Sequence, residues 1–429
     1  MNTKIIPIIS ISLLASSLFI SCEDNTYKEY RGNAPVYMTY DDLRAAVSTE
    51  ANVQLGNPGK IYFKDSYIFI VEELKGIHVY DNTNPALPVK KTFVKVPGVV
   101  DISVSGSTLY ADSYVDLVVL DVQDINNIHE TGRVENVLPY TVPATGNDYP
   151  MAGIDNRKGV VTGWELKTIR EKVVSQPNNY PIFWERGKYF LDAVNAGGAS
   201  SGLSGSGVGI GGSMARFGIR NEVLYILDQN SLKIFSIANK NVPAKYNELY
   251  PGWNMETMFL TDKYMFLGTT TGMVIMDITV PLSPQNKSFY NHMRSCDPVI
   301  VDDTLAYITL RSGTSCGGAL NTLDVVNVKN ISSPTLVATY PMTNPHGLGK
   351  DGNVLFVCDG SAGLKVYDAS DSRSISNHLL FSYPGINAYD VVPIGSVLVM
   401  IGDDGLYQYD YSNLSNIHLL SSITIIKED

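Results

Sequence analysis

The sequence contains few of the residues that build metal and redox sites. It has 4 cysteines and 6 histidines among 429 residues. Neither type occurs at the C-x-x-C or H-x-x-x-H spacing that places two ligands beside one metal ion. The histidines are dispersed along the chain, as His78, His129, His292, His346, His378 and His418. We therefore expect neither a metal nor a cofactor.

Basic side chains are also in deficit. The 32 lysines and arginines are outnumbered by 43 aspartates and glutamates, which gives a net charge of −11. A chain of this charge is repelled by the phosphates of nucleic acids and by anionic lipids. We expect no nucleic-acid partner, and contact with a membrane through a lipid anchor only.

The N-terminus carries an apolar run from Ile5 to Ile20, too short and too early for a stable membrane span and typical of a secretory signal. The run ends in "LFISC", which resembles the lipobox of bacterial lipoproteins, although Phe19 replaces the usual leucine and Ile20 a small residue. The resemblance implies a signal peptide over residues 1–21 and a diacylated Cys22. An ordinary signal peptide with an incidental cysteine is the alternative.

The segments after Cys22 set the expected cellular address. Residues 22–34 are polar and are typical of a tether. Glu23 and Asp24 resemble the signal that sends lipoproteins to the outer surface in certain Gram-negative lineages. This implies a surface-exposed outer-membrane protein, with a periplasm-facing one as the alternative. In the N-terminal extension, residues 35–56, "PVYMTYDDLRAAV" predicts a strand and a short helix that add cover or help to close the fold.

One short phrase recurs seven times along the rest of the chain, as "GIHVYD", "DLVVLD", "SLKIFS", "GMVIMD", "TLDVVN", "GLKVYD" and "GLYQYD". Most copies follow the previous one after about 41 residues, a spacing typical of propeller blades. Each unit reads as four antiparallel strands, and the phrase is the third of them, apolar on both sides because blades pack against neighbours on both faces. The sequence therefore predicts an all-β, seven-bladed β-propeller over residues 57–429.

The repeats, with the stretches "NPGKIYF", "LYADSYVDLVVLD" and "GGSMARF", resemble the LVIVD-repeat family of bacterial surface proteins. The resemblance extends from about Pro35 to the C-terminus. It implies the propeller fold and a surface location. It implies no chemistry, because that family has no catalytic motif to transfer and a fold does not determine a function.

Two insertions interrupt the period. Residues 141–208 separate blades two and three, and extra residues around "RSGTSCGGA" lengthen blade five. Both are expected on the face where the connections from the fourth strand to the next blade emerge, which we call the connection face. The first insertion is rich in aromatic side chains, of which Trp164 and Trp184 are candidate ligand contacts. The others are Tyr149, Tyr180, Phe183, Tyr189 and Phe190.

An ionisable residue opens the first strand of every blade. The seven are Lys60, Asp101, Arg216, Glu256, Asp297, His346 and Asp390, and we call them the ring positions. First strands line the channel of a propeller, so these side chains are expected at its mouth. Each either caps its own turn or pairs with the next blade, or together they bind a polar ligand or ion.

The remaining motifs are weak. Gly198, Ser200 and Gly202 fit G-x-S-x-G, and a G-x-G-x-x-G match follows at 207–212. Neither precedes a legible helix, so we expect a loop rather than a catalytic serine or a dinucleotide site. Cys296 and Cys316 are expected on one face of blade five and form a plausible disulfide in an exported protein, with two free thiols as the alternative.

The function expected from these features is a non-enzymatic surface scaffold that binds protein or glycan partners. A propeller-fold hydrolase or lyase acting on extracellular polysaccharide is the alternative. A deep pocket holding a carboxylate with a strongly raised pKa would favour catalysis, whereas an open, aromatic-lined face would favour binding.

Overall fold

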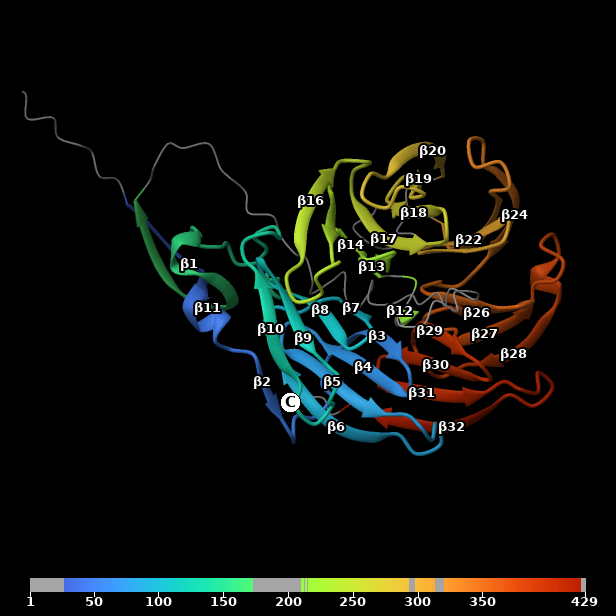
Figure 1. Cartoon of the computed structure of the whole chain (residues 1–429), viewed down its shortest axis with the longest axis horizontal. Helices are drawn as coiled ribbons and strands as arrows, with labels where there is room; N and C mark the ends of the chain where they lie inside the picture. Colours follow the sequence, from blue (N-terminus) through green and yellow to red (C-terminus); the bar gives the residue numbers. More distant parts are fainter. Residues whose placement is uncertain are drawn as a thin grey trace, which may run out of the picture.

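Seven antiparallel four-stranded sheets surround a central axis in the computed structural model, which describes residues 27–172, 210–211, 213, 215–292, 298–312 and 320–425 (Figure 1). In each sheet the strands follow one another in chain order, from the first strand inside to the fourth outside. First strands of neighbouring blades contact each other, as β7 and β13 do. The predicted seven-bladed β-propeller is thus confirmed.

The blade strands have the following bounds. Blade 1 consists of β3 (Pro58–Lys64), β4 (Tyr67–Glu72), β5 (Gly76–Asp81) and β6 (Val89–Lys95); blade 2 of β7 (Ile102–Ser105), β8 (Thr108–Ser113), β9 (Asp116–Asp121) and β10 (His129–Val134); blade 3 of β13 (Phe217–Arg220), β14 (Val223–Leu227), β15 (Leu232–Ser236) and β16 (Ala244–Leu249). Blade 4 consists of β17 (Met255–Leu260), β18 (Tyr264–Thr269), β19 (Gly272–Asp277) and β20 (Gln285–Asn291); blade 5 of β21 (Val299–Asp302), β22 (Leu305–Leu310), β23 (Thr322–Asn327) and β24 (Thr335–Pro341). Blade 6 consists of β25 (Leu348–Asp351), β26 (Val354–Cys358), β27 (Leu364–Asp368) and β28 (Leu379–Tyr383); blade 7 of β29 (Ala388–Ile394), β30 (Val397–Gly402), β31 (Gly405–Asp410) and β32 (His418–Thr424).

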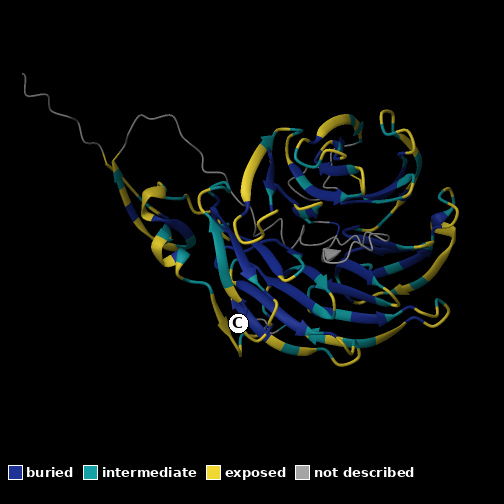
Figure 2. Ribbon diagram, in the orientation of Figure 1, coloured by how far each residue is buried: buried dark blue, intermediate teal, exposed yellow. Residues whose placement is uncertain are grey.

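The recurring phrase forms the third strand of each blade, and its letters have a structural reason. In "DLVVLD" every residue from Asp116 to Leu120 is buried, because both faces of the strand meet neighbouring blades. The closing acid ends the strand: the Asp81 carboxylate accepts the backbone N–H of Thr83 at 3.0 Å and turns the chain toward the fourth strand. Figure 2 shows the result, buried inner strands and exposed outer edges.

The ring closes between blades 7 and 1 by side-chain packing. Asn82 and Gln408 exchange two amide hydrogen bonds, of 2.8 and 2.7 Å, across this boundary. Ser421 donates to the carbonyl of Pro85 at 2.6 Å. Apolar residues of both blades, including Ile70 and Ile401, form one buried cluster beneath them. Among the described residues, no strand from one end of the propeller joins the blade at the other end, since the four main strands of each blade are consecutive.

The N-terminal extension adds cover and does not close the ring. Its first strand, β1 (Tyr27–Met38), begins within residues 22–34, so the prediction of a tether is wrong for residues 27–34, which are part of a strand. β1 pairs antiparallel with β11 (Val160–Lys172), so the insertion after blade 2, expected as a connection, contains a long strand. The two form a ribbon that projects from the propeller beside blade 2 (Figure 1). A short strand, β2 (Ser48–Glu50), extends blade 1 at its outer edge, and β12 (Ile210–Gly211) extends it at its inner edge.

A short helix docks the ribbon onto the propeller. The helix α1 (Tyr40–Arg44) begins at Thr39, whose hydroxyl accepts the N–H of Asp42 at 3.1 Å. Leu43 is fully buried in a cluster with Tyr114, Val115 and Val160. Arg44 reaches the buried carboxylate of Asp116 at 3.0 Å. The "TYDDLRAAV" stretch is therefore a capped helix that covers the connection face of blade 2.

Candidate functional site

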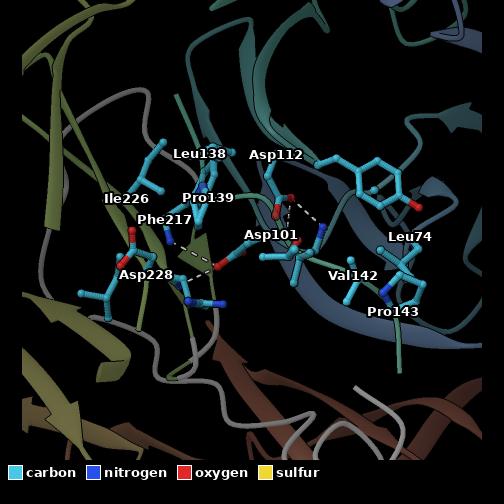
Figure 3. Close-up of a pocket in the computed structure, with 16 residues that line it drawn as sticks. Leu74, Asp101, Asp112, Leu138, Pro139, Val142, Pro143, Phe217, Ile226 and Asp228 are labelled. Atoms are coloured by element: carbon cyan, nitrogen blue, oxygen red, sulfur yellow. Dashed lines mark hydrogen bonds between the residues drawn. The ribbon is translucent and has the colours of Figure 1, made fainter. Parts of the chain in front are cut away.

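Three ring positions meet where blades 1, 2 and 3 adjoin the channel. The carboxylate of Asp101 accepts a hydrogen bond from the ammonium group of Lys60 at 2.5 Å. The same oxygen accepts the backbone N–H groups of Arg216 and Phe217, at 2.5 and 3.2 Å (Figure 3). Its other oxygen accepts the N–H of Ile102 at 2.8 Å. Asp101 is thus a clamp that joins three blades.

The clamp is buried, which sets its electrostatics. Asp101 is 2% exposed, and the Lys60 side chain is 11% exposed. Burial lowers the pKa of Lys60, and the attraction of Asp101 opposes that shift. The sequence left two interpretations of the ring positions, a structural role such as pairing with the next blade, or ligand binding. At Lys60 and Asp101 the structure shows pairing between adjacent blades. Whether the ring also binds a ligand stays a prediction.

A second layer of carboxylates, which the sequence analysis missed, ends the second strand of several blades. Asp112 accepts the backbone N–H groups of Val100 and Asp101 at 2.6 and 2.9 Å. Glu72 holds Gly56 and Asn57 in the same way, and Asp359 holds Thr343 and Asn344. These acids fix the segments that carry the ring positions. In the sequence, these carboxylates could have been recognised as an acidic residue that recurs at the end of the second strand.

The ring positions of blades 6 and 7, His346 and Asp390, are also buried but have other hydrogen-bond partners than the clamp. Asp390 is 2% exposed; its carboxylate accepts the N–H of Val391 at 2.6 Å. Burial raises the pKa of Asp390 to about 7. The Nε2 atom of His346 lies 3.2 Å from the Asn344 amide and 3.4 Å from the Arg311 guanidinium, which both donate. Burial and the charge of Arg311 therefore hold the pKa of His346 well below its usual value.

The remaining predicted site residues are scattered or lie outside the described residues. Glu256 lies in β17, half-buried. Trp164 lies in β11, and its indole donates to the carbonyl of Pro143 at 2.7 Å. Cys358 is fully buried in β26. Outside the described residues are Cys22, Trp184, Cys296, Asp297 and Cys316, together with the serine and all of the glycines that define the two weak motifs.

The connection face is hollowed between blades 2 and 3. A cavity of about 40 Å³ lies over the clamp, lined among others by Asp101, Asp112 and Arg216 (Figure 3). Beside it a cleft of about 390 Å³ runs from Leu138 past Arg216 to Lys233 and Tyr250. We call this second hollow the blade 2–3 cleft.

An ion-pair network forms the blade-3 wall of the cleft. Lys233, 5% exposed, donates to Asp228, to Glu248 at 2.9 Å and to the hydroxyl of Ser231 at 2.7 Å. Burial alone would lower the pKa of Lys233, but these hydrogen bonds outweigh it and raise the pKa. Lys245 binds Glu248 at 2.5 Å from outside. The wall is therefore polar and rigid, with its charges compensated.

One exposed aromatic side chain lines the cleft, and two others are exposed on neighbouring residues of the chain. Tyr250, which lines it, is 73% exposed, and Trp253 in the same connection is 80% exposed. Tyr246, on the outer strand β16, is 62% exposed. Side chains of this kind offer flat apolar surface with a polar tip, the features that stack on sugars and anchor protein interfaces.

The described residues provide neither a cluster of metal ligands nor a membrane-spanning helix. No group of three or more His, Cys, Asp or Glu side chains there could hold a metal ion. No helix in that part of the chain is long and apolar enough to cross a membrane. On the opposite face of blades 2 and 3, a polar hollow of about 420 Å³ is lined by Asp121, Lys240 and Asn241.

Comparison with known proteins supports the fold alone. No family model and no curated protein matches the chain. The computationally designed protein Ika8 is similar in structure, with a TM-score of 0.51 and 9% identity over 93% of both chains. BamB from Moraxella catarrhalis has a TM-score of 0.47 and 8% identity, covering 89% of this chain and 97% of its own. For Kluyveromyces lactis Hsv2 the TM-score is 0.46 and the identity 10%, covering 82% and 94%.

The resemblance to the LVIVD-repeat family consequently stays a prediction.

Proposed function

We propose that this protein is a non-enzymatic binding scaffold, anchored at the cell surface through Cys22, which captures a protein or glycan partner at the blade 2–3 cleft. The observation that carries the proposal is the open cleft of about 390 Å³ bordered by Tyr250, with Trp253 exposed in the same connection. Exposed aromatic side chains keep apolar surface in contact with water, which is unfavourable. A partner that covers them would remove that surface from water.

The charges of the cleft favour binding over catalysis. Lys233 and Lys245 balance the charges of Asp228 and Glu248, and despite burial these pairs lower the pKa of both carboxyls and raise that of Lys233, so each keeps its usual charge. Asp390 is the described carboxylate whose pKa is raised to about 7, and it lines neither this cleft nor the other two hollows. The carboxylate with a raised pKa, which would favour a hydrolase or lyase, is therefore not in the open cleft.

The binding site is tested by removing its aromatic rim. A partner is first identified by glycan array and by cross-linking on intact cells. Tyr250→Ala combined with Trp253→Ala should then weaken binding at least tenfold, as loss of anchoring aromatics typically does, while the melting temperature stays unchanged. Tyr246→Ala is the matched control, because Tyr246 is equally exposed but outside the cleft. Equal affinity of the double variant and the wild type would rule out this site.

The anchoring and the address are tested separately. Cys22→Ser should release the protein from membranes or block its processing, because two acyl chains form a stable attachment. Protease treatment of intact cells should digest the wild-type protein if it faces outward; protection would indicate the periplasm-facing alternative. Unchanged membrane fractionation of the variant after a high-salt wash, which removes electrostatic attachment, would contradict lipidation.

A further inference from the structure

The tip of the β1–β11 ribbon sorts its charges onto two faces. Residues directly opposite in an antiparallel pair lie on the same face, and faces alternate along each strand. One face carries Tyr27, Glu29 and Arg31 on β1, opposite Lys172, Arg170 and Thr168 on β11. We call it the cationic face, because it has three cations and one carboxylate. The other face carries Lys28, Tyr30 and Gly32, opposite Glu171, Ile169 and Lys167.

The second face is covered, and its charges are paired: Lys167 lies 3.2 Å from Glu165, two residues along the same face. Lys28 pairs with Glu171 at 3.5 Å, and the hydroxyl of Tyr30 donates to the same carboxylate at 2.8 Å. Glu171 also accepts the N–H of Gly153 at 2.8 Å, so the chain before β11 packs here. Ile169 is buried. This face therefore belongs to the internal packing of the ribbon.

The cationic face is open. Arg31 and Arg170 are exposed, and Tyr27 is 50% exposed. The guanidinium of Arg170 lies 4.8 Å from the centre of the Tyr27 ring. On a protein whose net charge is −11, a positive face with an amphipathic aromatic ring is the local exception. Lysine or arginine beside tyrosine is the combination that proteins place at the interface between lipid headgroups and water.

The chain itself places this tip near a membrane. Figure 1 shows the ends of β1 and β11 far from the ring. Tyr27 follows Cys22 by five residues, and five residues span at most about 17 Å. If Cys22 carries the acyl chains, the tip cannot lie farther than that from the bilayer surface.

We propose that the cationic face of the ribbon binds the anionic phosphate headgroups of a phospholipid membrane, so that the ribbon orients the anchored propeller. The proposal rests on the anchoring part of the proposed function and adds a second, electrostatic contact to it. Net charge alone predicted repulsion from such lipids; the alternation of the two strands leaves one face of the ribbon with more cations than carboxylates.

The test uses the chain from residue 22 to 429 with Cys22→Ser, which contains every described element and lacks an anchor. Vesicles of phosphatidylcholine, with or without phosphatidylglycerol, are sedimented with the protein. We expect binding only to the vesicles with phosphatidylglycerol, and loss of that binding at high salt. Arg31→Gln with Arg170→Gln should weaken it about 25-fold, at roughly fivefold for each cation.

The control variant is Lys329→Gln with Arg373→Gln, two exposed cations in the loops on the opposite face of the ring. It should bind the vesicles like the wild type. The proposal is overturned if the wild type shows no preference for phosphatidylglycerol or if the control loses as much affinity as the ribbon variant. It is also overturned if sedimentation shows that the ribbon variant has instead broken a dimer, since the occupant of the face would then be a second copy.

Failure here is distinguishable from failure of the proposed function, because the vesicle assay needs neither lipidation nor the blade 2–3 cleft. Loss of partner binding in the Tyr250 and Trp253 variant leaves vesicle binding untouched. Unchanged fractionation of Cys22→Ser in cells would contradict the lipid anchor, and the vesicle assay would still test the cationic face independently.

Discussion

At the scale of the residue, Asp101 illustrates how a propeller uses a buried charge. Its carboxylate joins the side chain of one blade to the backbone of another, by bonds of 2.5 Å to Lys60 and to the Arg216 N–H. An ion pair that is buried contributes little net stability when intact, but removal of one partner leaves the other charge uncompensated. Removal of one partner of the clamp should therefore destabilise the fold much more than replacement of the whole pair by apolar side chains.

We predict that Asp101→Ala lowers the free energy of unfolding by about 3–5 kcal/mol, because it strands the Lys60 charge and three backbone donors. Denaturant unfolding measures the loss. Asp148→Ala removes an exposed carboxylate and should change stability by less than about 0.5 kcal/mol. A similarly small loss for Asp101→Ala would show that the ring position is not structural and would favour a ligand site.

At the scale of the element, the ribbon and α1 form a unit that depends on a small contact with the propeller. That contact is the cluster around Leu43, which is fully buried against Tyr114, Val115 and Val160. The blades have far larger cores of their own, for example the cluster shared by blades 1 and 2. The ribbon should accordingly be able to detach while the ring persists.

Leu43→Ala should cost the docking of α1 about 2–5 kcal/mol, the range for deleting a buried leucine side chain. The expected result is faster hydrogen exchange in residues 27–56 and 160–172 with unchanged protection of β8 and β9. Leu87→Ala, at a side chain that is 68% exposed, is the control. Equal loss of protection in the ring would mean that the ribbon and the propeller unfold together.

At the scale of the whole molecule, closure of the ring rests on the boundary between blades 7 and 1. Because no described strand is exchanged there, the boundary depends on a buried apolar cluster and on the amide pair of Asn82 and Gln408. Both amides are buried, at 5% and 0% exposure. Removal of Gln408 takes away the amide partner of Asn82, whereas removal of Asn82 strands the carbonyl oxygen of Gln408, whose Nε2 still donates to Pro85 and Ser421 at 3.1 and 3.2 Å.

Gln408→Ala and Asn82→Ala should each lower the free energy of unfolding by about 1–3 kcal/mol, the desolvation cost of an orphaned amide. The double variant should lose clearly less than the sum, because the second change removes the orphan. Thermal unfolding of the four chains measures this cycle, with Gln285→Ala as the exposed control. Strict additivity would show that the two side chains do not interact in solution.

The sequence alone was sufficient for the architecture, because the repeat is local. A phrase such as "DLVVLD" specifies a strand buried on both faces, and its closing acid specifies the turn that follows. Seven such units at a nearly constant spacing can bury their faces only against one another. The number of blades and their strand composition could therefore be predicted without tertiary information.

Only the tertiary structure decided what depends on distant segments. Asp101 contacts Arg216 across 115 residues, β1 pairs with β11 across the whole of the first two blades, and Asn82 meets Gln408 across 326 residues. Nothing local in the chain encodes these partners, because each is chosen by the shape of the assembled ring. The same reason separates the cationic face from the net charge: composition counts side chains, whereas pairing across the ribbon determines which of them share a surface.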